Sequence, residues 1–255
     1  MPAAIAWYTG IIIDRSIGQK GANVIMREDI TSIPVSEVFE PKDGCPICRM
    51  RNLLERRVAE YITGAAMMEP DVRIETNKLG FCFDHYRLIL KQRNRLGVAL
   101  MLESHLAELE KEVFEGLPLL GKRADKQAKS ASQRTKTCFL CRQVDWAMER
   151  MLATVCRLWE QERDFRNLFD EQQALCLPHF SLLVETAEKS MSKRNQPEFA
   201  KAAASLAHNY CTEVHGDVAH FCKMFDYRNN TEDADWGNSR DSVERTIWFL
   251  TSREP

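Results

Sequence analysis

The sequence alternates two CxxC motifs with two CxxH motifs, in the order Cys45-Pro46-Ile47-Cys48, Cys82-Phe83-Asp84-His85, Cys138-Phe139-Leu140-Cys141 and Cys176-Leu177-Pro178-His179. Thirty-three residues separate the first CxxC from the first CxxH, and 34 separate the second pair. A pattern of four metal-ligand residues that recurs at nearly the same spacing is typical of an internal duplication. Each copy would then read CxxC…CxxH.

The likeness between the two copies extends beyond the cysteines and histidines. Matching residues are 93 positions apart up to the middle of each copy and 94 apart afterwards, as one inserted residue requires. The further matches are Arg49 with Arg142, Arg57 with Arg150, Asp71 with Asp164, Arg73 with Arg166, Tyr86 with Phe180, and Leu88 with Leu182. Duplication is the simplest explanation of these matches.

Between the motifs, apolar residues recur at three- and four-residue steps. This periodicity predicts helices over about 48–67 in the first copy and near 142–167, 177–192 and 198–225 in the second. No stretch shows the alternation and turn residues typical of strands and hairpins. We therefore predict an all-α fold of two duplicated helical repeats, each closed by its own CxxC…CxxH metal site.

Zinc favours four thiolate or imidazole ligands at the corners of a tetrahedron. Two cysteines three residues apart on a tight turn can occupy two corners, and a CxxH motif that opens a helix can supply the other two from one helical face. The long spacer could run out as a helix and return as an extended segment. The sequence predicts two zinc ions per chain, one held by Cys45, Cys48, Cys82 and His85 and the other by Cys138, Cys141, Cys176 and His179.

Other uses of these cysteines stay open at this point. They could be reduced structural residues without metal, or ligands of an iron–sulfur cluster or haem. The sequence therefore leaves open whether the metal bound in the cell is zinc or iron. The Cys-Pro-x-Cys form of residues 45–48 also occurs in thiol–disulfide exchange proteins, but those place it in a βαβ context that is missing here. Four protein ligands close the shell, which favours a structural ion over a catalytic one. No other catalytic motif is present, so we do not expect an enzyme.

Two functions of different kinds remain. One is a zinc-stabilised binding or scaffold module. The other is a thiol- or metal-responsive sensor, in which oxidation would eject zinc and form a disulfide within Cys45–Cys48 or Cys138–Cys141. A dedicated sensor would keep one stable site and one exposed, reactive site. Because the two quartets match closely, we expect both to retain metal, which favours the scaffold.

The segments outside the motifs suggest a division of the chain. We expect a first repeat over 26–116, a linker over 117–137, a second repeat over 138–227, and a tail over 228–255 whose short helix docks on the body. The linker is basic, with Lys122, Arg123, Lys126, Lys129, Arg134 and Lys136. It reads as a solvated hinge, and nucleic-acid binding through it is a further, weaker alternative.

Composition limits the class of protein. The 255 residues are 44% hydrophobic, which suffices for a real core, and the net charge of −2 gives no general attraction to nucleic acid or anionic lipid. The apolar stretch Ala3–Ile13 is too short to span a bilayer. Nine cysteines, an odd number, exclude a fully paired disulfide framework in a monomer. We expect a cytoplasmic protein without membrane association; its protein or small-molecule partner and its oligomeric state stay open.

Two further groups of residues are candidates for a site. Asp71 and Arg73, with their counterparts Asp164 and Arg166, predict a repeated ion-pair brace or, alternatively, a ligand contact. A second, weaker metal candidate lies in one helical stretch and comprises His208, Cys211, His215, His220 and Cys222. Several apolar neighbours make core or helix-surface positions the simpler interpretation.

The run Ile33-Pro34-Val35-Ser36-Glu37-Val38-Phe39-Glu40, the first CxxC, Met68–Arg73, Gly80–Cys82 and the later Phe225–Asn229 resemble the DUF6062-type family of bacterial proteins of unknown function, seen chiefly in anaerobic Firmicutes. The resemblance covers about residues 27–252. It implies a cytoplasmic bacterial protein and no established activity. Residues 1–25 depart from the pattern, so we expect a dispensable, loosely packed extension with Met26 as an alternative start, unless its apolar part packs as an arm.

Overall fold

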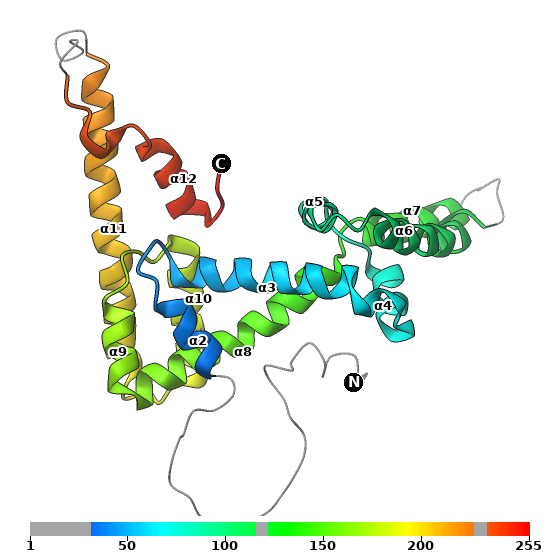
Figure 1. Cartoon of the computed structure of the whole chain (residues 1–255), viewed down its shortest axis with the longest axis horizontal. Helices are drawn as coiled ribbons and strands as arrows, with labels where there is room; N and C mark the ends of the chain where they lie inside the picture. Colours follow the sequence, from blue (N-terminus) through cyan, green and yellow to red (C-terminus); the bar gives the residue numbers. More distant parts are fainter. Residues whose placement is uncertain (1–31, 116–121, 227–233) are drawn as a thin grey trace, which may run out of the picture. The chain divides into compact units, whose positions relative to one another are not determined.

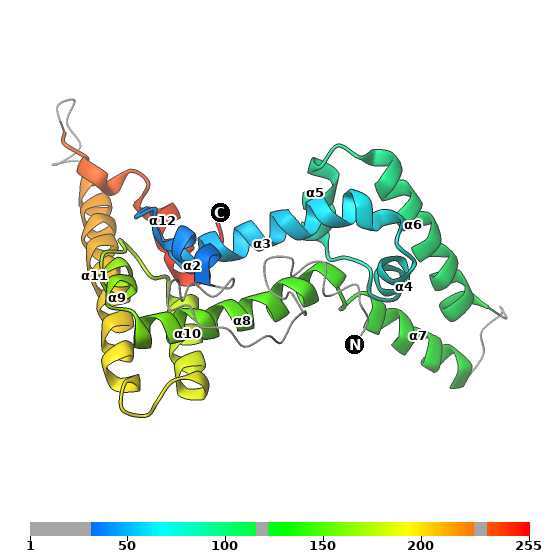
Figure 2. The same cartoon turned by 60° about the horizontal axis from the view of Figure 1, so that its bottom comes forward.

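The computed structural model describes residues 32–115, 122–226 and 234–255, and every regular element in these ranges is a helix (Figures 1 and 2). The α-helices are α2 (Ser32–Phe39), α3 (Pro46–Thr63), α4 (Pro70–Leu79), α5 (Phe83–Lys91), α6 (Arg95–Leu109), α7 (Lys122–Arg134), α8 (Phe139–Gln161), α9 (Arg163–Asp170), α10 (Leu177–Ser190), α11 (Gln196–Met224) and α12 (Ser242–Thr251). Short helices are η1 (Ala65–Met68), η2 (Glu110–Phe114) and η3 (Gly237–Ser239). The all-α prediction is confirmed, and the predicted extension 1–25 lies outside the described residues.

The chain forms two compact units. Within the described residues, unit 1 comprises 51–148, and unit 2 combines the segment up to Met50 with Glu149–Pro255. Helix α3 begins in unit 2 and continues into unit 1, whereas α8 begins in unit 1 and continues into unit 2. The units therefore differ from the predicted repeats 26–116 and 138–227. Each unit takes the CxxC of one copy and the CxxH of the other.

The core of unit 2 is a chain of aromatic contacts. Phe39 of α2 packs against Phe165 and Phe169 of α9, with ring centroids 5.1 and 5.9 Å apart. Phe199 of α11 lies 5.5 Å from Phe169 and 5.2 Å from Trp159 at the end of α8. All five rings are at most 3% exposed. Burial of such large side chains supplies much of the stability of this unit.

The last helix, α12, packs on α10 and α11 (Figures 1 and 2). Arg245 of α12 donates a hydrogen bond of 2.7 Å to Asp217 of α11. Trp248 and Phe249 contact Tyr210 of α11, with centroids 5.5 and 5.7 Å apart. An ion pair beside an aromatic cluster thus fixes the tail helix on unit 2.

In unit 1, α4 packs on α6. Arg73 of α4 donates hydrogen bonds of 2.9 Å to the Leu100 carbonyl and 2.7 Å to Ser104 Oγ. Gly80 ends α4 at a φ of +57°, which favours glycine, and its carbonyl accepts a 2.8 Å hydrogen bond from the Phe139 amide. This contact joins the segment before the first CxxH to the start of α8.

The predicted linker 117–137 contains a helix. Its Lys, Arg, Ala and Gln residues are good helix formers, and residues 122–134 form α7. Arg134 pairs with Glu112 of η2 and donates to the Lys78 carbonyl, so α7 is fixed to unit 1 by specific contacts. A solvated hinge does not describe this part of the segment.

The predicted Asp–Arg ion-pair brace is wrong among the described residues. Asp71 and Asp164 are exposed in the first turns of α4 and α9, where a negative charge faces the positive end of the helix. Arg73 bonds to α6 as described, and Arg166 donates to the Trp159 and Glu160 carbonyls while its guanidinium lies 4.6 Å over the Trp159 ring. The arginines brace the returning helices through backbone carbonyls and an aromatic face.

Candidate metal centres

The eight predicted ligands meet in two clusters, each of three cysteines and one histidine. The outer cluster comprises Cys45, Cys48, Cys176 and His179 in unit 2, and the inner cluster comprises Cys82, His85, Cys138 and Cys141 in unit 1. The names refer to the sequence, because the inner ligands all lie between Cys48 and Cys176. In each cluster the four ligand atoms lie within 4.8 Å of one another.

The prediction that each quartet lies within one repeat is wrong, because each cluster joins the CxxC of one copy to the CxxH of the other. Pairing within one repeat requires residues 68–81 to run back along the whole of the long helix, which they can do only if they are extended. Residues 70–79 are instead helical, and the chain returns only to the level of Glu55, whose Oε1 lies 3.7 Å from His85 Nε2. Glu55 is seven residues, or about 10 Å of helix, further along α3 than Cys48. The CxxH motif therefore meets the other CxxC, at the start of α8.

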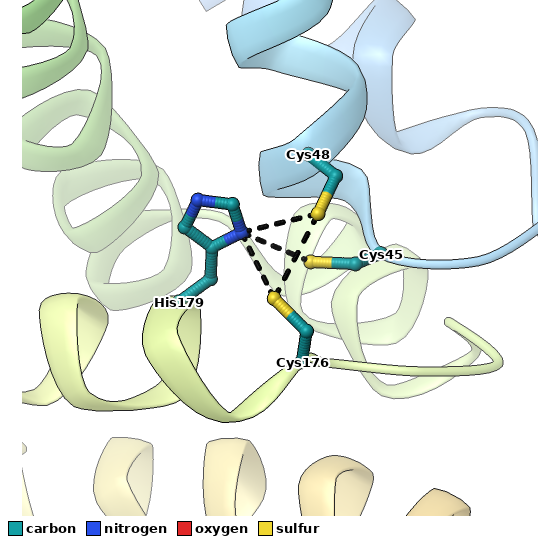
Figure 3. A group of neighbouring side chains, drawn as sticks. All are labelled: Cys45, Cys48, Cys176 and His179. Carbon is teal, nitrogen blue, oxygen red and sulfur yellow. Dashed lines mark hydrogen bonds between the residues drawn. The ribbon is translucent and has the colours of Figure 1, made fainter. Parts of the chain in front are cut away.

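In the outer cluster, one imidazole nitrogen faces three sulfur atoms (Figure 3). His179 Nδ1 lies 3.6 Å from Cys45 Sγ, 3.3 Å from Cys48 Sγ and 3.1 Å from Cys176 Sγ. The Cys48 and Cys176 sulfurs are 3.7 Å apart. The two CxxC cysteines come from the start of α3 and the other two ligands from the start of α10.

The inner cluster repeats this arrangement. His85 Nδ1 lies 3.2 Å from Cys82 Sγ, 3.2 Å from Cys138 Sγ and 3.3 Å from Cys141 Sγ. The Cys82 and Cys141 sulfurs are 3.9 Å apart. The same histidine nitrogen faces the sulfurs in both clusters.

These separations fit a tetrahedral metal ion. Zinc–sulfur bonds of about 2.3 Å and zinc–nitrogen bonds of about 2.0 Å give tetrahedron edges of about 3.8 Å between sulfurs and about 3.5 Å between sulfur and nitrogen. One sulfur–sulfur distance in each cluster is close to this edge, 3.7 Å for Cys48–Cys176 and 3.9 Å for Cys82–Cys141, and the nitrogen–sulfur distances run from 3.1 to 3.6 Å. The side chains present therefore fit one zinc-sized ion in each cluster.

Local backbone structure places the ligands. Cys82 and Cys176 are the N-caps of α5 and α10, in extended conformation, and the histidine three residues later lies in the first helical turn. This is the helix-opening geometry expected for CxxH, with the cysteine and the histidine on one helical face. At the CxxC motifs, the amide of the residue after the second cysteine donates to the carbonyl of Cys45 or Cys138, which closes a helical turn at 3.2 Å.

Without metal, the thiols of each cluster compete for protons. Burial raises the pKa of Cys138, but the hydrogen bond to His85 and nearby amides outweigh it and lower that pKa to about 6. Burial and the neighbouring Cys138 charge raise the pKa of Cys141 well above its usual range. Burial opposes protonation of His85, yet its bonds to Cys138 and Glu55 raise its pKa to about 10. Within this CxxC motif, the first cysteine, Cys138, is thus the more acidic of the two.

The outer cluster follows the same rule. Burial disfavours the Cys45 thiolate, but hydrogen bonds from Cys176, Cys48 and His179 lower its pKa well below the usual value. The bond to Cys45 raises the pKa of Cys176 to about 12, and bonds to Cys176 and Cys45 raise that of Cys48 further. A divalent cation would displace the protons that these thiols retain.

The clusters differ in exposure and in their surroundings. All four outer ligands are buried, whereas Cys82 and Cys141 of the inner cluster are partly exposed. Glu55 approaches the free nitrogen of His85 and also bonds to Arg51 at 3.2 Å. Sequence reasoning missed Glu55, because the matching position 93 residues later is Met148 and the repeat comparison gives no signal there.

The side chains of the second metal candidate, on α11, do not come together as a set of metal ligands. His208, Cys211, His215, His220 and Cys222 all lie on this one helix. Cys211 and Cys222 are exposed, and His220 Nε2 lies 2.9 Å from the Asp235 carbonyl. Within the described ranges, only the outer and inner clusters bring three or more potential metal ligands together.

No helix in the described part of the chain combines the length and the apolarity that crossing a membrane requires. Comparison with curated proteins and with solved structures finds no match. A family model does match, over residues 26–255, which include both CxxC motifs, both CxxH motifs and every described helix. The chain therefore belongs to the family of unknown function DUF6062.

Proposed function

We propose that each cluster binds one zinc ion and that the two ions stabilise a helical binding or scaffold module. The observation that supports this most directly is the convergence of three sulfurs and one Nδ1 from two distant segments at the edge lengths of a zinc tetrahedron. Free thiols that only fill a core have no reason to meet in this geometry twice.

A structural role suits these sites because four protein ligands leave no position for substrate or water. The outer site would tie the start of α3 to the start of α10, because Cys176 lies 128 positions after Cys48. The inner site would tie the start of α5 to the start of α8, because Cys141 lies 59 positions after Cys82. A link across such long loops removes much conformational freedom from the unfolded chain.

The partner of the module is a protein or small molecule, and a reducing compartment suits it. All nine cysteines are free thiols, and six of them join two histidines in the two clusters. Unpaired cysteines of this kind fit a cytoplasmic protein. Nucleic-acid binding through the basic segment is a weaker candidate, because Arg134 is paired with Glu112 and an aspartate, Asp125, lies among the lysines.

The proposal is tested by metal analysis of the full chain, purified under reducing conditions without added metal. We expect two zinc ions per chain. Replacement by Co²⁺ should give the absorption bands of tetrahedral cobalt with thiolate charge transfer, which report the S₃N shell independently of stoichiometry. Cys211→Ser, which changes an exposed cysteine outside both clusters, is the matched control and should retain both ions. Freshly reduced protein without stoichiometric metal would contradict the proposal.

A further inference from the structure

The two clusters share their ligand set and geometry but not their access to solvent. In the outer cluster, Cys48 is 9% exposed and Cys176 is fully buried. The corresponding inner cysteines are Cys141 and Cys82, and both are partly exposed. A small polar molecule in solution can reach the inner sulfurs far more readily than the outer ones.

The helices that precede the two CxxC motifs differ in the same direction. Before the outer CxxC, α2 buries Val35 and Phe39 completely. Arg49, next to Cys48, donates to the Val38 carbonyl at 2.9 Å, and Gln172 donates to the Phe39 carbonyl at 2.7 Å. The end of α2 is therefore held beside the outer cluster.

Before the inner CxxC stands the polar helix α7, and none of its described side chains is buried. The residue after Cys82 also differs from its counterpart. Phe83 is 75% exposed, whereas Leu177, after Cys176, is 45% exposed. The helix before the inner CxxC and the residue after Cys82 are thus both more exposed than their outer counterparts, although Phe81 and Phe139 pack together beside the inner cysteines.

We propose that Cys82 and Cys141 form an oxidation site, which hydrogen peroxide converts into a disulfide with release of the inner zinc ion, while the outer cluster stays reduced. This inference rests on the zinc binding proposed above. The two sulfurs lie 3.9 Å apart, so they need little movement to bond. The equivalent outer pair, Cys48 and Cys176, is as close at 3.7 Å, which makes it an internal control for exposure.

The chemistry is a two-electron oxidation. One thiolate attacks the peroxide O–O bond, which breaks; the sulfur becomes a sulfenic acid and hydroxide leaves. The second thiolate attacks that sulfur, the S–S bond forms, and a second hydroxide leaves. Two thiolates are oxidised, one peroxide is reduced, and two protons convert the hydroxides into two waters. Cys138 and His85 remain, and two ligands do not hold a zinc ion tightly.

This pair differs from a disulfide within one CxxC in its structural effect. A Cys82–Cys141 bond joins the start of α5 to the first turn of α8, as the inner ion would. Oxidation would therefore release metal while keeping the two segments tethered. A reducing thiol should reverse the step.

The experiment treats the zinc-loaded full chain with a small excess of hydrogen peroxide. Released zinc is followed with a colorimetric chelator, and the remaining thiols are alkylated and mapped by peptide mass spectrometry. We expect one of two ions to leave, at least about tenfold faster than the other, with a Cys82–Cys141 disulfide as the product. Loss of both ions at equal rates, or a Cys138–Cys141 disulfide, would overturn the inference and leave zinc binding itself intact.

Two single variants repeat the test site by site. Cys82→Ser leaves only the outer ion, which should resist peroxide, and Cys176→Ser leaves only the inner ion, which should be released. Circular dichroism before oxidation shows whether each variant is folded. If a variant is unfolded, the disulfide mapped in the oxidised wild-type chain decides whether the inference holds. A chain that holds no zinc before oxidation would instead contradict the proposed function.

Discussion

The outer and inner clusters present the same four ligands in two different environments. All four outer ligands are buried in unit 2, which also holds the packed rings of Phe39, Phe165 and Phe169. The inner ligands lie between helices whose neighbouring side chains include the exposed Phe83. The comparison teaches that ligand spacing determines which ion can bind, whereas the surrounding helices determine how strongly that ion contributes to folding and what can reach it.

The largest expected effect tests which motifs share an ion. In the clusters seen here, Cys45→Ser with Cys82→Ser damages both sites, and the double variant should lose both ions. Cys82→Ser with Cys141→Ser damages the inner site alone and should retain one ion. Motifs paired within repeats give the opposite result for each double variant. Metal analysis of the two purified proteins decides between the pairings, and Cys211→Ser serves as control.

A second prediction concerns stability. Cys176→Ser should lower the free energy of unfolding by more than about 4 kcal/mol, because it leaves buried thiols and an imidazole without their metal. Cys141→Ser should cost clearly less, since water can solvate the partly exposed inner ligands. Urea unfolding followed by circular dichroism measures both. Equal losses would mean that exposure does not separate the two sites.

The third prediction concerns the pH dependence of zinc affinity. At pH 7 the metal-free inner cluster holds protons on His85, with a pKa near 10, and on Cys141, whose pKa is raised further. Binding must displace both, so zinc affinity should rise with pH, and these two groups alone should lower it at least about 100-fold from pH 8 to pH 7. Below about pH 6, Cys138 also takes up a proton and the inner curve should steepen.

The curve of zinc affinity against pH should not steepen below pH 6 for the outer site, because the pKa of Cys45 is lowered well below its usual range. Chelator competition from about pH 5 to pH 8, which spans the Cys138 pKa of about 6, measures each site alone, with Cys82→Ser reporting the outer ion and Cys176→Ser the inner one. An inner affinity that does not change with pH would show that the free cluster holds no protons for zinc to displace.

Sequence reasoning identified the eight residues that the structure brings together, because a CxxC and a CxxH motif each restrict local geometry. It also predicted the helical class from apolar periodicity. The pairing of motifs depended on whether residues 68–81 are extended or helical, and the presence of α4 there decided it. The difference in exposure goes with the residues outside the motifs, since α2 before the outer CxxC is apolar and buried whereas α7 before the inner CxxC is polar, and the matched motifs do not encode this.

The smallest expected effect concerns Glu55, which distinguishes the clusters in a second way. A ligand histidine whose other nitrogen faces a carboxylate is held in one orientation and one tautomer, with Nδ1 left for the metal. His85 Nε2 lies 3.7 Å from Glu55 Oε1, and the matching position in the other copy is Met148. Glu55→Gln should weaken zinc at the inner site about tenfold and leave the outer site unchanged. Glu60→Gln, on the same helix and exposed, is the matched control. Competition titration in the Cys176→Ser background reads the inner ion alone, and an unchanged affinity there would show that Glu55 pairs with Arg51 without orienting His85.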